Sequence, residues 1–460
     1  MADTSGADTS GAERTVRPGN EDWWAVGIGL GIVVVALVLS RLGLSLHWLA
    51  VLPPRWKTFG QVTADLATNY PRYIAQFVFW AAVFGGALSA LGYRLRDFLA
   101  AFVPLYLAAY VIFVLGQWDK AVGYNLEPPL VALFLGLLVA NTVGVPARLV
   151  AGLRGELYVK TGIVLLGATV PLTLIALAGP VAVGQAAIVS IVTFSVIYFI
   201  AVRLGLDRRF AATLGVGGAV CGVSAAIAIA GAVGAKRENA SVTISAVVLW
   251  AIAMIFALPL ISRALLLPTG VAGAWIGTSE FADAAGIAAA QAYGGLAGKV
   301  PGITGSADQA LQAFTLMKVL GRDVWIGIWA VALAVVATTR WRDQPGTGAP
   351  DVREIWRRFP KFVIGFLAAS AIVSVLTAGL SLADYNKIAV PAFVGPIKDM
   401  RTWAFIFCFF SIGLTTRFDQ LARAGSKPML AFTAGVAVNV VLGYVLSVYV
   451  FGAYWQHLGG

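Results

Sequence analysis

The residues best placed for chemistry lie in a glycine-dense stretch from Gly215 to Ala232. Glycine costs a helix interior about 1 kcal/mol relative to alanine, so a cluster of glycines favours local unwinding. A helix that restarts after Gly222 would point free backbone N–H groups and its positive dipole end at a cavity, which suits an anion. The alternative is close packing of helices through small residues. The predicted anion cradle consists of Gly217, Gly218, Cys221, Gly222 and Ser224.

A second polar group lies in the otherwise apolar segment 274–291. Glu280 and Asp283 are three residues apart, so a continuous helix would carry them on one face. Ionisable side chains are costly inside a membrane span and usually face a cavity or a partner. We therefore predict that these acids couple transport to a proton or a cation, with the hydroxyls of Thr278 and Ser279 as substrate ligands. The alternative is that the segment begins at the membrane interface and both acids are hydrated.

Two further positions could contact an anion. Arg322 follows Lys318 by four residues, and the pair could hold an anionic substrate or neutralise nearby acids. The alternative is that both side chains snorkel to the membrane surface. Thr415 and Arg417 follow a short apolar run, where a hydroxyl and a guanidinium would form an oxyanion contact, or the run would end in an ordinary helix cap. Arg322 or Arg417 is the predicted charge partner.

What the sequence lacks narrows the function. Two histidines and two cysteines are too few for a transition-metal ligand set, and no G-x-x-x-x-G-K-[ST] phosphate loop is present. We expect no metal, no cofactor and no enzymatic activity. The net charge of +11 fits Lys and Arg retained in cytoplasmic loops better than nucleic-acid binding. An enzyme acting on a lipid would need a polar catalytic cluster at one interface, and a non-transporting receptor would bind ligand without flux.

The composition decides what surrounds these groups. Hydrophobic residues make up 59% of the 460 residues and charged residues 12%, whereas a soluble domain carries roughly a quarter charged residues. Lipid must therefore be the main solvent, and we predict an all-α polytopic membrane protein with about thirteen spans of about 20 residues each. The expected spans are 23–40, 74–92, 98–116, 128–143, 162–179, 182–202, 211–233, 240–260, 272–294, 323–340, 362–381, 402–416 and 428–452.

The predicted domains are a disordered cytoplasmic tail at 1–22, extra N-terminal helices at 23–125 and a carrier body at 126–455. Residues 128–143 and 402–416 are short for a span and could be broken or re-entrant. An internal echo aligns Gly167–Gly179 with Gly413–Gly425 without gaps. Repeats are common in secondary transporters, and chance similarity of Gly- and Ala-rich helices is the alternative.

Several motifs together resemble one family. They are G-x-G-G-A-V-C-G-V-S-A-A at 215–226, L-L-G-A-T-V at 165–170, W-I-G-T-S at 275–279, R-F-P-K-F at 358–362 and S-I-G-L-T-T-R-F at 411–418. This set is similar to the YeiH-type membrane family, which carries the label of sulfate exporters. The resemblance covers roughly residues 128–451 and leaves the first three spans outside.

The resemblance implies a ten-helix, inverted-repeat carrier body, distantly similar to the bile-acid symporter and sodium–proton antiporter superfold. Such a body has a core domain with crossed, broken helices and a panel or dimerisation domain. This chain departs from the family pattern, because Phe281 and Ala282 stand where the family has a histidine followed by an acid. The spacing of four between Lys318 and Arg322 also differs from the usual three.

We therefore predict a multi-pass inner-membrane carrier that exports a small anion, such as sulfate or a sulfonate, by alternating access of the elevator type. The alternative is a sodium- or proton-coupled carrier of another organic anion. The expected partners are the substrate, the bilayer, a coupling H⁺ or Na⁺ and a second copy in a homodimer, with no nucleic acid.

Overall fold

The fold is helical throughout the described part of the chain. The computed structural model describes residues 18–123, 128–341, 356, 359–380, 384–418 and 425–458, and within them the one strand-like pairing is an isolated bridge between Trp56 and Trp118. Seven helices there are long and apolar enough to cross a membrane. They are Glu21–Arg41, Phe59–Ala90, Leu95–Gly116, Leu172–Arg203, Glu238–Ala264, Ala307–Arg340 and Ser426–Val450. The prediction of a multi-span helical protein is confirmed, whereas the count of thirteen and the inverted repeat stay predictions.

The helices form two groups by packing. In the first, the scaffold group, α1 packs on α7 and α17, α3 on α2 and α5, and α19 on α5 and α7. Its members are α1 (Pro18–Arg41), α2 (Phe59–Ala90), α3 (Leu95–Gly116), α5 (Pro128–Thr142), α7 (Gly155–Gly167), α17 (Lys361–Thr377), η3 (Tyr385–Val394) and α19 (Gly395–Thr415). Three short segments, η1 (Leu46–Trp48), α4 (Asp119–Gly123) and α6 (Ala147–Val150), connect them.

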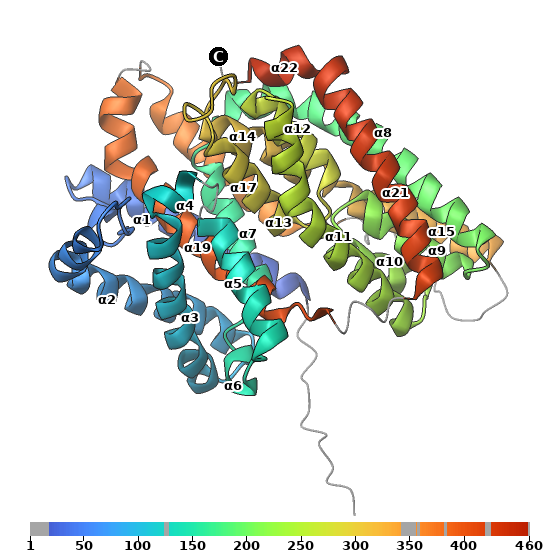
Figure 1. Ribbon diagram of the computed structural model, residues 1–460, viewed down its shortest axis with the longest axis horizontal. Helices are drawn as coiled ribbons and strands as arrows, with labels where there is room; N and C mark the ends of the chain where they lie inside the picture. The colour runs from blue at the N-terminus through green and yellow to red at the C-terminus, as the bar shows by residue number, and fades with distance from the viewer. Residues whose placement is uncertain are drawn as a thin grey trace, which may run out of the picture.

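The second group, the crossing group, holds the remaining helices. Here α8 packs on α9 and α21, α12 on α14, and α13 on α11 and α14. Its members are α8 (Leu172–Arg203), α9 (Arg208–Ala219), α10 (Val223–Val233), α11 (Arg237–Ala264), α12 (Thr269–Ser279), α13 (Asp283–Gly294), α14 (Ala307–Thr315), η2 (Leu316–Arg322), α15 (Trp325–Arg340), α21 (Ser426–Tyr444), η5 (Val445–Val450) and α22 (Gly452–Gln456). In Figure 1 the blue and teal helices of the scaffold group lie on the left, with α8, α9, α11 and α21 on the right.

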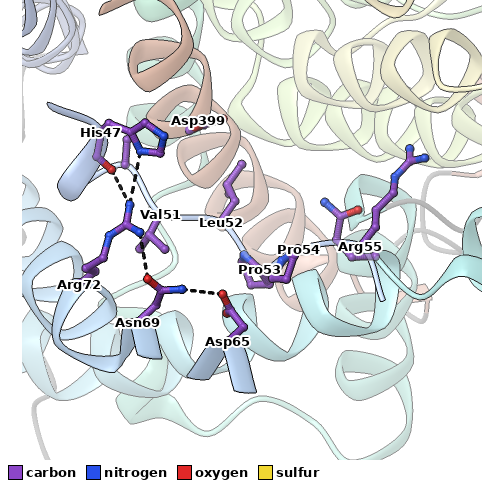
Figure 2. Close-up of a pocket in the computed structure, with 12 residues that line it drawn as sticks. His47, Val51, Leu52, Pro53, Pro54, Arg55, Asp65, Asn69, Arg72 and Asp399 are labelled. Atoms are coloured by element: carbon purple, nitrogen blue, oxygen red, sulfur yellow. Dashed lines mark hydrogen bonds between the residues drawn. The ribbon is translucent and has the colours of Figure 1, made fainter. Parts of the chain in front are cut away.

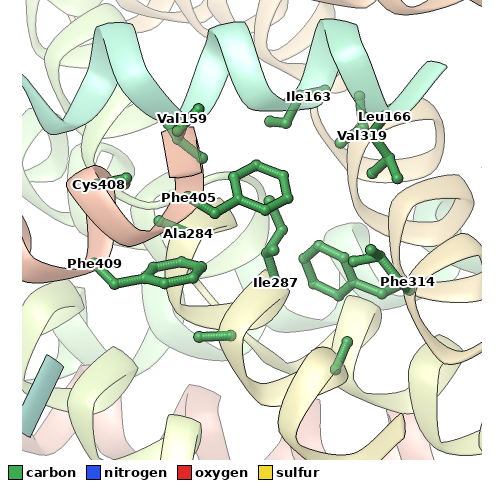
Figure 3. Packing of buried hydrophobic residues seen from close by; sticks show 14 of the residues in the cluster. Val159, Ile163, Leu166, Ala284, Ile287, Phe314, Val319, Phe405, Cys408 and Phe409 are labelled. Carbon is green, nitrogen blue, oxygen red and sulfur yellow. The ribbon is translucent and has the colours of Figure 1, made fainter. Parts of the chain in front are cut away.

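An apolar seam joins the two groups. Its main helix contacts are α13 against α5 and α19, and α8 against α17. Figure 3 shows buried side chains from α7 and α19, among them Ile163 and Phe405, packed against Ile287 of α13 and Phe314 of α14. Polar contacts also bridge the groups at exposed positions: Lys398 Nζ lies 2.8 Å from Asp308 Oδ1, and Leu172 N of α8 donates to Ser374 Oγ of α17 at 2.8 Å.

The N-terminal helices are attached to α19 through aromatic packing. The ring of Tyr106 stacks on that of Trp403, with centroids 4.8 Å apart, and Trp80 lies edge-on to Phe407. The connection from α1 to α2 is held there as well, because Trp403 Nε1 donates to Val51 O at 2.8 Å. These helices therefore belong to the scaffold group as a packed part of it.

A polar pocket of about 290 Å³ lies beside this connection (Figure 2). His47, Arg72 and Asp399 line it, and Arg72 donates to the carbonyls of His47 and Trp48 at 2.6 and 2.9 Å. Its walls come from the α1–α2 connection, α2 and the start of α19. The pocket thus belongs entirely to the scaffold group.

Three sequence boundaries need correction. The expected spans 162–179 and 182–202 are instead α7, which ends at Gly167, and α8, which runs from Leu172 to Arg203. Proline explains the shift, because Pro171 precedes the first turn of α8, whereas Pro180 lies inside this long helix. The start of α2 is Phe59, earlier than the expected 74, because its first turns are polar and outside any hydropathy window. Of the predicted tail 1–22, residues 1–17 lie outside the described residues and 18–22 begin α1.

Candidate functional site

The glycine-dense stretch is a broken helix. α9 ends at Ala219, the backbone of Val220 turns away at φ −122° and ψ −107°, and α10 restarts at Val223. Gly222 closes the break at φ +69°, in the region that favours glycine. The prediction that this stretch unwinds and restarts after Gly222 is confirmed.

A second break lies in the next membrane segment. α12 ends at Ser279, Glu280 and Ala282 are extended, and α13 begins at Asp283. The Glu280 carboxylate accepts hydrogen bonds from the amides of Phe281 and Ala282 at 2.8 and 3.2 Å, so it caps the start of α13. The prediction that Glu280 and Asp283 share a helical face is therefore wrong, because the break separates them.

The two breaks touch. A Cβ placed on Gly222 would lie 2.7 Å from the carbonyl oxygen of Phe281 and 2.5 Å from a methyl group of Val247 on α11. Glycine is required here by space as well as by its positive φ. The other cradle glycines serve packing: Gly217 faces Thr243, and Gly218 faces Ile197. Both interpretations of the stretch, unwinding and small-residue packing, thus hold at different positions.

A third element brings cations to the place where the two helix breaks meet, which is called the crossing from here on. The helix from Ala307 to Arg340 contains a widened, π-helical turn at η2, and Asp323 N donates to Lys318 O at 3.0 Å in its i to i−5 pattern. Such single widened turns are frequent at functional sites. Because 3.6 residues form an ordinary turn, the widening moves Asp323 onto the same side as Lys318.

Lys318 fills the space between the two breaks. Its Nζ donates to Val220 O at 2.9 Å, to Glu280 O at 3.0 Å and to Phe281 O at 3.3 Å. These carbonyls belong to the breaks after α9 and α12, where the helix dipole places partial negative charge. Lys318 is fully buried, so its three N–H groups replace water at both helix ends.

Arg322 makes a parallel bridge. Its Nη1 donates to Thr278 O at 2.6 Å and to Glu280 O at 3.1 Å, and its Nη2 donates to Gly218 O at 3.3 Å. The side chain is fully buried, and its Nε has no hydrogen-bond partner among the described residues. The snorkelling interpretation of Lys318 and Arg322 is wrong, because both lie inside the protein in the middle of a membrane helix.

Two aspartates complete the cluster. Asp283 Oδ1 lies 3.7 Å from Lys318 Nζ, and its side chain is 19% exposed. Asp323, which the sequence analysis did not single out, is 1% exposed and faces Asp283. Neither oxygen of Asp323 receives a hydrogen bond from the described residues. Its one sequence signal is the Arg–Asp pair at 322–323, which marked the edge of an expected span.

The hydroxyls predicted as ligands are placed differently. Thr278 donates to Trp275 O at 2.8 Å, whereas Ser279 Oγ is buried without a partner among the described residues. Both face α21, since a Cβ on Gly443 would lie within 2.8 Å of either oxygen. The Ser279 hydroxyl thus has its hydrogen-bonding capacity free, whereas the Thr278 hydroxyl donates within its own helix.

Thr415 and Arg417 lie at a different place in the fold. Thr415 is exposed at the end of α19 and donates to Ser411 O at 2.9 Å. The backbone that follows is held by Asn141 of α5, which donates to Thr416 O and accepts from Phe418 N. These hydrogen bonds tie the end of α19 to α5. The helix-cap alternative describes Thr415, and Arg417 follows it in the same segment.

The start of α10 remains open. Within the described residues, the backbone amides of Val223 and Ser224 have no acceptor, and the Ser224 side chain is exposed. Cys221, in the break itself, is buried and close enough to Lys318 and Asp323 for electrostatic interaction. Four helix ends meet at the crossing. Lys318 and Arg322 bind the C-terminal ends of α9 and α12, and Glu280 caps the N-terminus of α13. The N-terminus of α10 is the end that remains.

The comparisons identify relatives across most of this architecture. A family model described as "Conserved hypothetical protein 698" matches residues 99–432. A UPF0324 membrane protein of Rhodopirellula baltica is 32% identical over 394 residues, covering 84% of this chain and 69% of that protein. One of Nitratidesulfovibrio vulgaris is 31% identical and covers 84% and 65%, and one of Nitrosomonas europaea is 28% identical and covers 95% of both.

The match thus spans about two thirds of the length of the first two relatives. No solved structure matches. The family match begins inside α3 and includes both helix breaks and the cation-bearing turn. The chain therefore belongs to the Conserved hypothetical protein 698 family, the YeiH-type multi-pass membrane proteins, as its motifs predicted.

Proposed function

We propose that this protein is a secondary transporter that carries a small anion, such as sulfate or a sulfonate, across the inner membrane. The observation that carries the proposal is the interrupted membrane helix α9–α10, whose second half begins with unoccupied amides beside buried cations. Irregular backbone at membrane depth is tolerated only where protein buries it or where it lines a cavity.

The anion would bind at the N-terminus of α10. The amides of Val223 and Ser224 supply donors and the helix dipole supplies positive potential. The exposed hydroxyl of Ser224 adds a third donor that a solute can reach. Arg322 supports the same site from inside, because its guanidinium keeps an unpaired Nε. An oxyanion with several acceptor oxygens fits this set of donors.

Transport would proceed by movement of the crossing group along the scaffold group. The seam between them is apolar, and apolar side chains can slide past one another without leaving buried hydrogen bonds unmade. The chain passes between the groups at 168–171, at 341–360 and at 416–425, so each group is built from two separate chain segments. The internal echo falls on the first and third of these passages, which lie at the ends of α7 and α19.

Coupling would use the acids at the crossing. Glu280 and Asp283 were predicted for this role, and both belong to the α12–α13 break. Asp283 is the partly accessible member and is ion-paired with Lys318. A coupling ion that binds here would change the charge beside the anion site. This arrangement supports ion-coupled transport over passive conduction.

The test is flux of radiolabelled sulfate and of a labelled sulfonate in proteoliposomes. Ser224→Ala and Glu280→Gln are expected to abolish flux while leaving the protein folded. The matched controls are Ser89→Ala at the exposed end of α2 and Glu238→Gln at the exposed start of α11, which should transport as wild type. Wild-type flux in Ser224→Ala would remove the α10 assignment, and wild-type flux in Glu280→Gln would remove the coupling role of Glu280.

The alternative is a sodium- or proton-coupled carrier of another organic anion. The same buried acids favour it, because they need a counter-ion whatever the cargo is. Flux of a panel of carboxylates, each measured with a sodium gradient and with a pH gradient, separates the two. Carboxylate uptake without sulfate or sulfonate uptake would establish the alternative.

A further inference from the structure

The crossing holds a buried cluster of charged groups. Lys318 and Arg322 come from η2, Glu280 from the end of α12, Asp283 from the start of α13 and Asp323 from the turn after η2. Cys221 of the first break also faces these five residues. Glu156 and Lys160 of α7, which form an ion pair with each other, interact with Asp283 as well. If all five ionise, two positive charges oppose three negative charges, and the cluster carries one uncompensated negative charge.

An uncompensated charge is costly at this depth. Isolated ions buried in a low-dielectric medium are strongly disfavoured unless they are paired or neutralised. Lys318 and Arg322 do not offer their hydrogens to Asp323, because they donate to backbone carbonyls of the two breaks. Glu280 accepts two backbone amides on Oε1, whereas its Oε2 has no hydrogen-bond partner among the described residues.

Asp283 and Asp323 differ from Glu280 because they face each other without a hydrogen-bond donor between them. The two carboxyl groups face each other. Yet Asp283 Oδ1 and both oxygens of Asp323 receive no hydrogen bond from the described residues. Two adjacent carboxylates repel each other and have no hydrogen to share, whereas one bound proton removes the repulsion and supplies the missing hydrogen bond.

We propose that Asp283 and Asp323 together hold one exchangeable proton, which makes the cluster neutral and is the coupling ion of the carrier. Asp283 is the point of entry, because part of its side chain is accessible, and Asp323 is the sealed partner. A proton from the solvent adds to one carboxylate oxygen and is shared with the oxygen of the facing carboxylate. No other bond is made or broken.

This assignment deepens the proposed transport function and rests on it for its biological meaning. Release of the proton returns a negative charge to the crossing, close to the helix break where the anion would bind. Proton and anion therefore bind together, and each favours the binding of the other. The coupling ion is then H⁺ and not Na⁺.

Infrared spectroscopy of the purified protein tests the proton site without any substrate. Wild-type protein at neutral pH is expected to show the carbonyl stretch of a protonated carboxyl group. A ¹³C label at the aspartate carboxyl carbons should lower the frequency of that band, whereas a ¹³C label at the glutamate carboxyl carbons should leave its frequency unchanged. Asp323→Asn and Asp283→Asn should each remove it, because either change already neutralises the cluster.

Asp97→Asn, at an exposed acid in the first turn of α3, is the matched control and should keep the band. A folded wild-type protein without the band, or a band that persists in Asp323→Asn, overturns the assignment. A band that shifts with glutamate label also overturns it and places the proton on Glu280. Because the readout needs no flux, loss of the proton site and loss of the transport function are separate results.

Discussion

The Lys318 ammonium lies 2.9 Å from the carbonyl oxygen of Val220 and so caps the helix that ends at the first break. The same nitrogen binds Glu280 O and Phe281 O at the second break. A single buried side chain thus holds together three segments that are far apart in the sequence. Its main role is to make the interrupted backbone stable at membrane depth.

Replacing Lys318 by methionine tests that role. The change keeps most of the volume and leaves Val220 O, Phe281 O and Asp283 without a cationic partner, while Glu280 O keeps its bond from Arg322. Removing one member of a buried charge pair costs roughly 3 to 5 kcal/mol, so the thermal unfolding temperature should fall sharply. Lys427→Met, at an exposed lysine in the first turn of α21, should leave it unchanged. Equal unfolding temperatures for the two variants would contradict the capping role.

Arg322→Lys is expected to fail although it keeps the charge. A guanidinium reaches Thr278 O and Gly218 O at once through two nitrogens, whereas an ammonium is a single point of donation. At least one buried carbonyl is left unpaired, at a cost of about 1 to 3 kcal/mol. Thermal unfolding in detergent measures this loss, and a fully stable lysine variant would show that one bridge is dispensable.

Gly222→Ala should destabilise the protein through the backbone. The residue has φ +69°, and the new methyl group would lie 2.7 Å from Phe281 O. A backbone at φ +69° and ψ −106° is sparsely populated and costs a non-glycine residue roughly 1 to 3 kcal/mol, before the two breaks are pushed apart. Gly184→Ala is the control, because nothing lies within 4 Å of its Cβ position inside α8. That variant should be neutral or slightly more stable.

Cross-linking Asp308 of α14 to Lys398 of α19 tests the proposed movement. Their side chains form an exposed ion pair across the two helix groups. Asp308→Cys with Lys398→Cys, joined by a short cross-linker that a reductant cleaves, is expected to stop flux until the link is cut. The native cysteines are buried, and each single-cysteine variant treated with the same reagent controls for modification alone. Undiminished flux in the linked protein would rule out sliding at this seam.

The sequence predicted one helix break and missed the other for a physical reason. Gly222 and its neighbours weaken a helix by themselves, so local composition reveals the first break. Glu280, Phe281 and Ala282 carry no such signal. Their extended backbone is stabilised by Lys318 and Arg322, nearly forty residues further along the chain, and by the approach of Gly222. No local pattern contains that information.

The sequence placed the charged residues in and next to η2 at the end of a membrane span. The reason is that charged side chains lower the mean hydropathy, so an expected span ends where they occur. Lys318, Arg322 and Asp323 therefore marked the edge of an expected span, although the helix continues from Ala307 to Arg340. Their charges are compatible with the interior only because backbone carbonyls and facing acids surround them. The family motifs predicted the membership correctly, and the positions of Thr415 and Arg417 away from the crossing emerged only from the packing of α19 on α5.

The double capping by η2 has a mechanical consequence. Any shift of the long helix along its axis would break, at the same time, the hydrogen bonds that Lys318 and Arg322 make to the two broken helices. The long helix and both interrupted helices are thus locked into a single stiff block, and a rearrangement inside that block is far more expensive than moving it whole. In the proposed transport cycle, an anion bound at the crossing would therefore move together with its binding site.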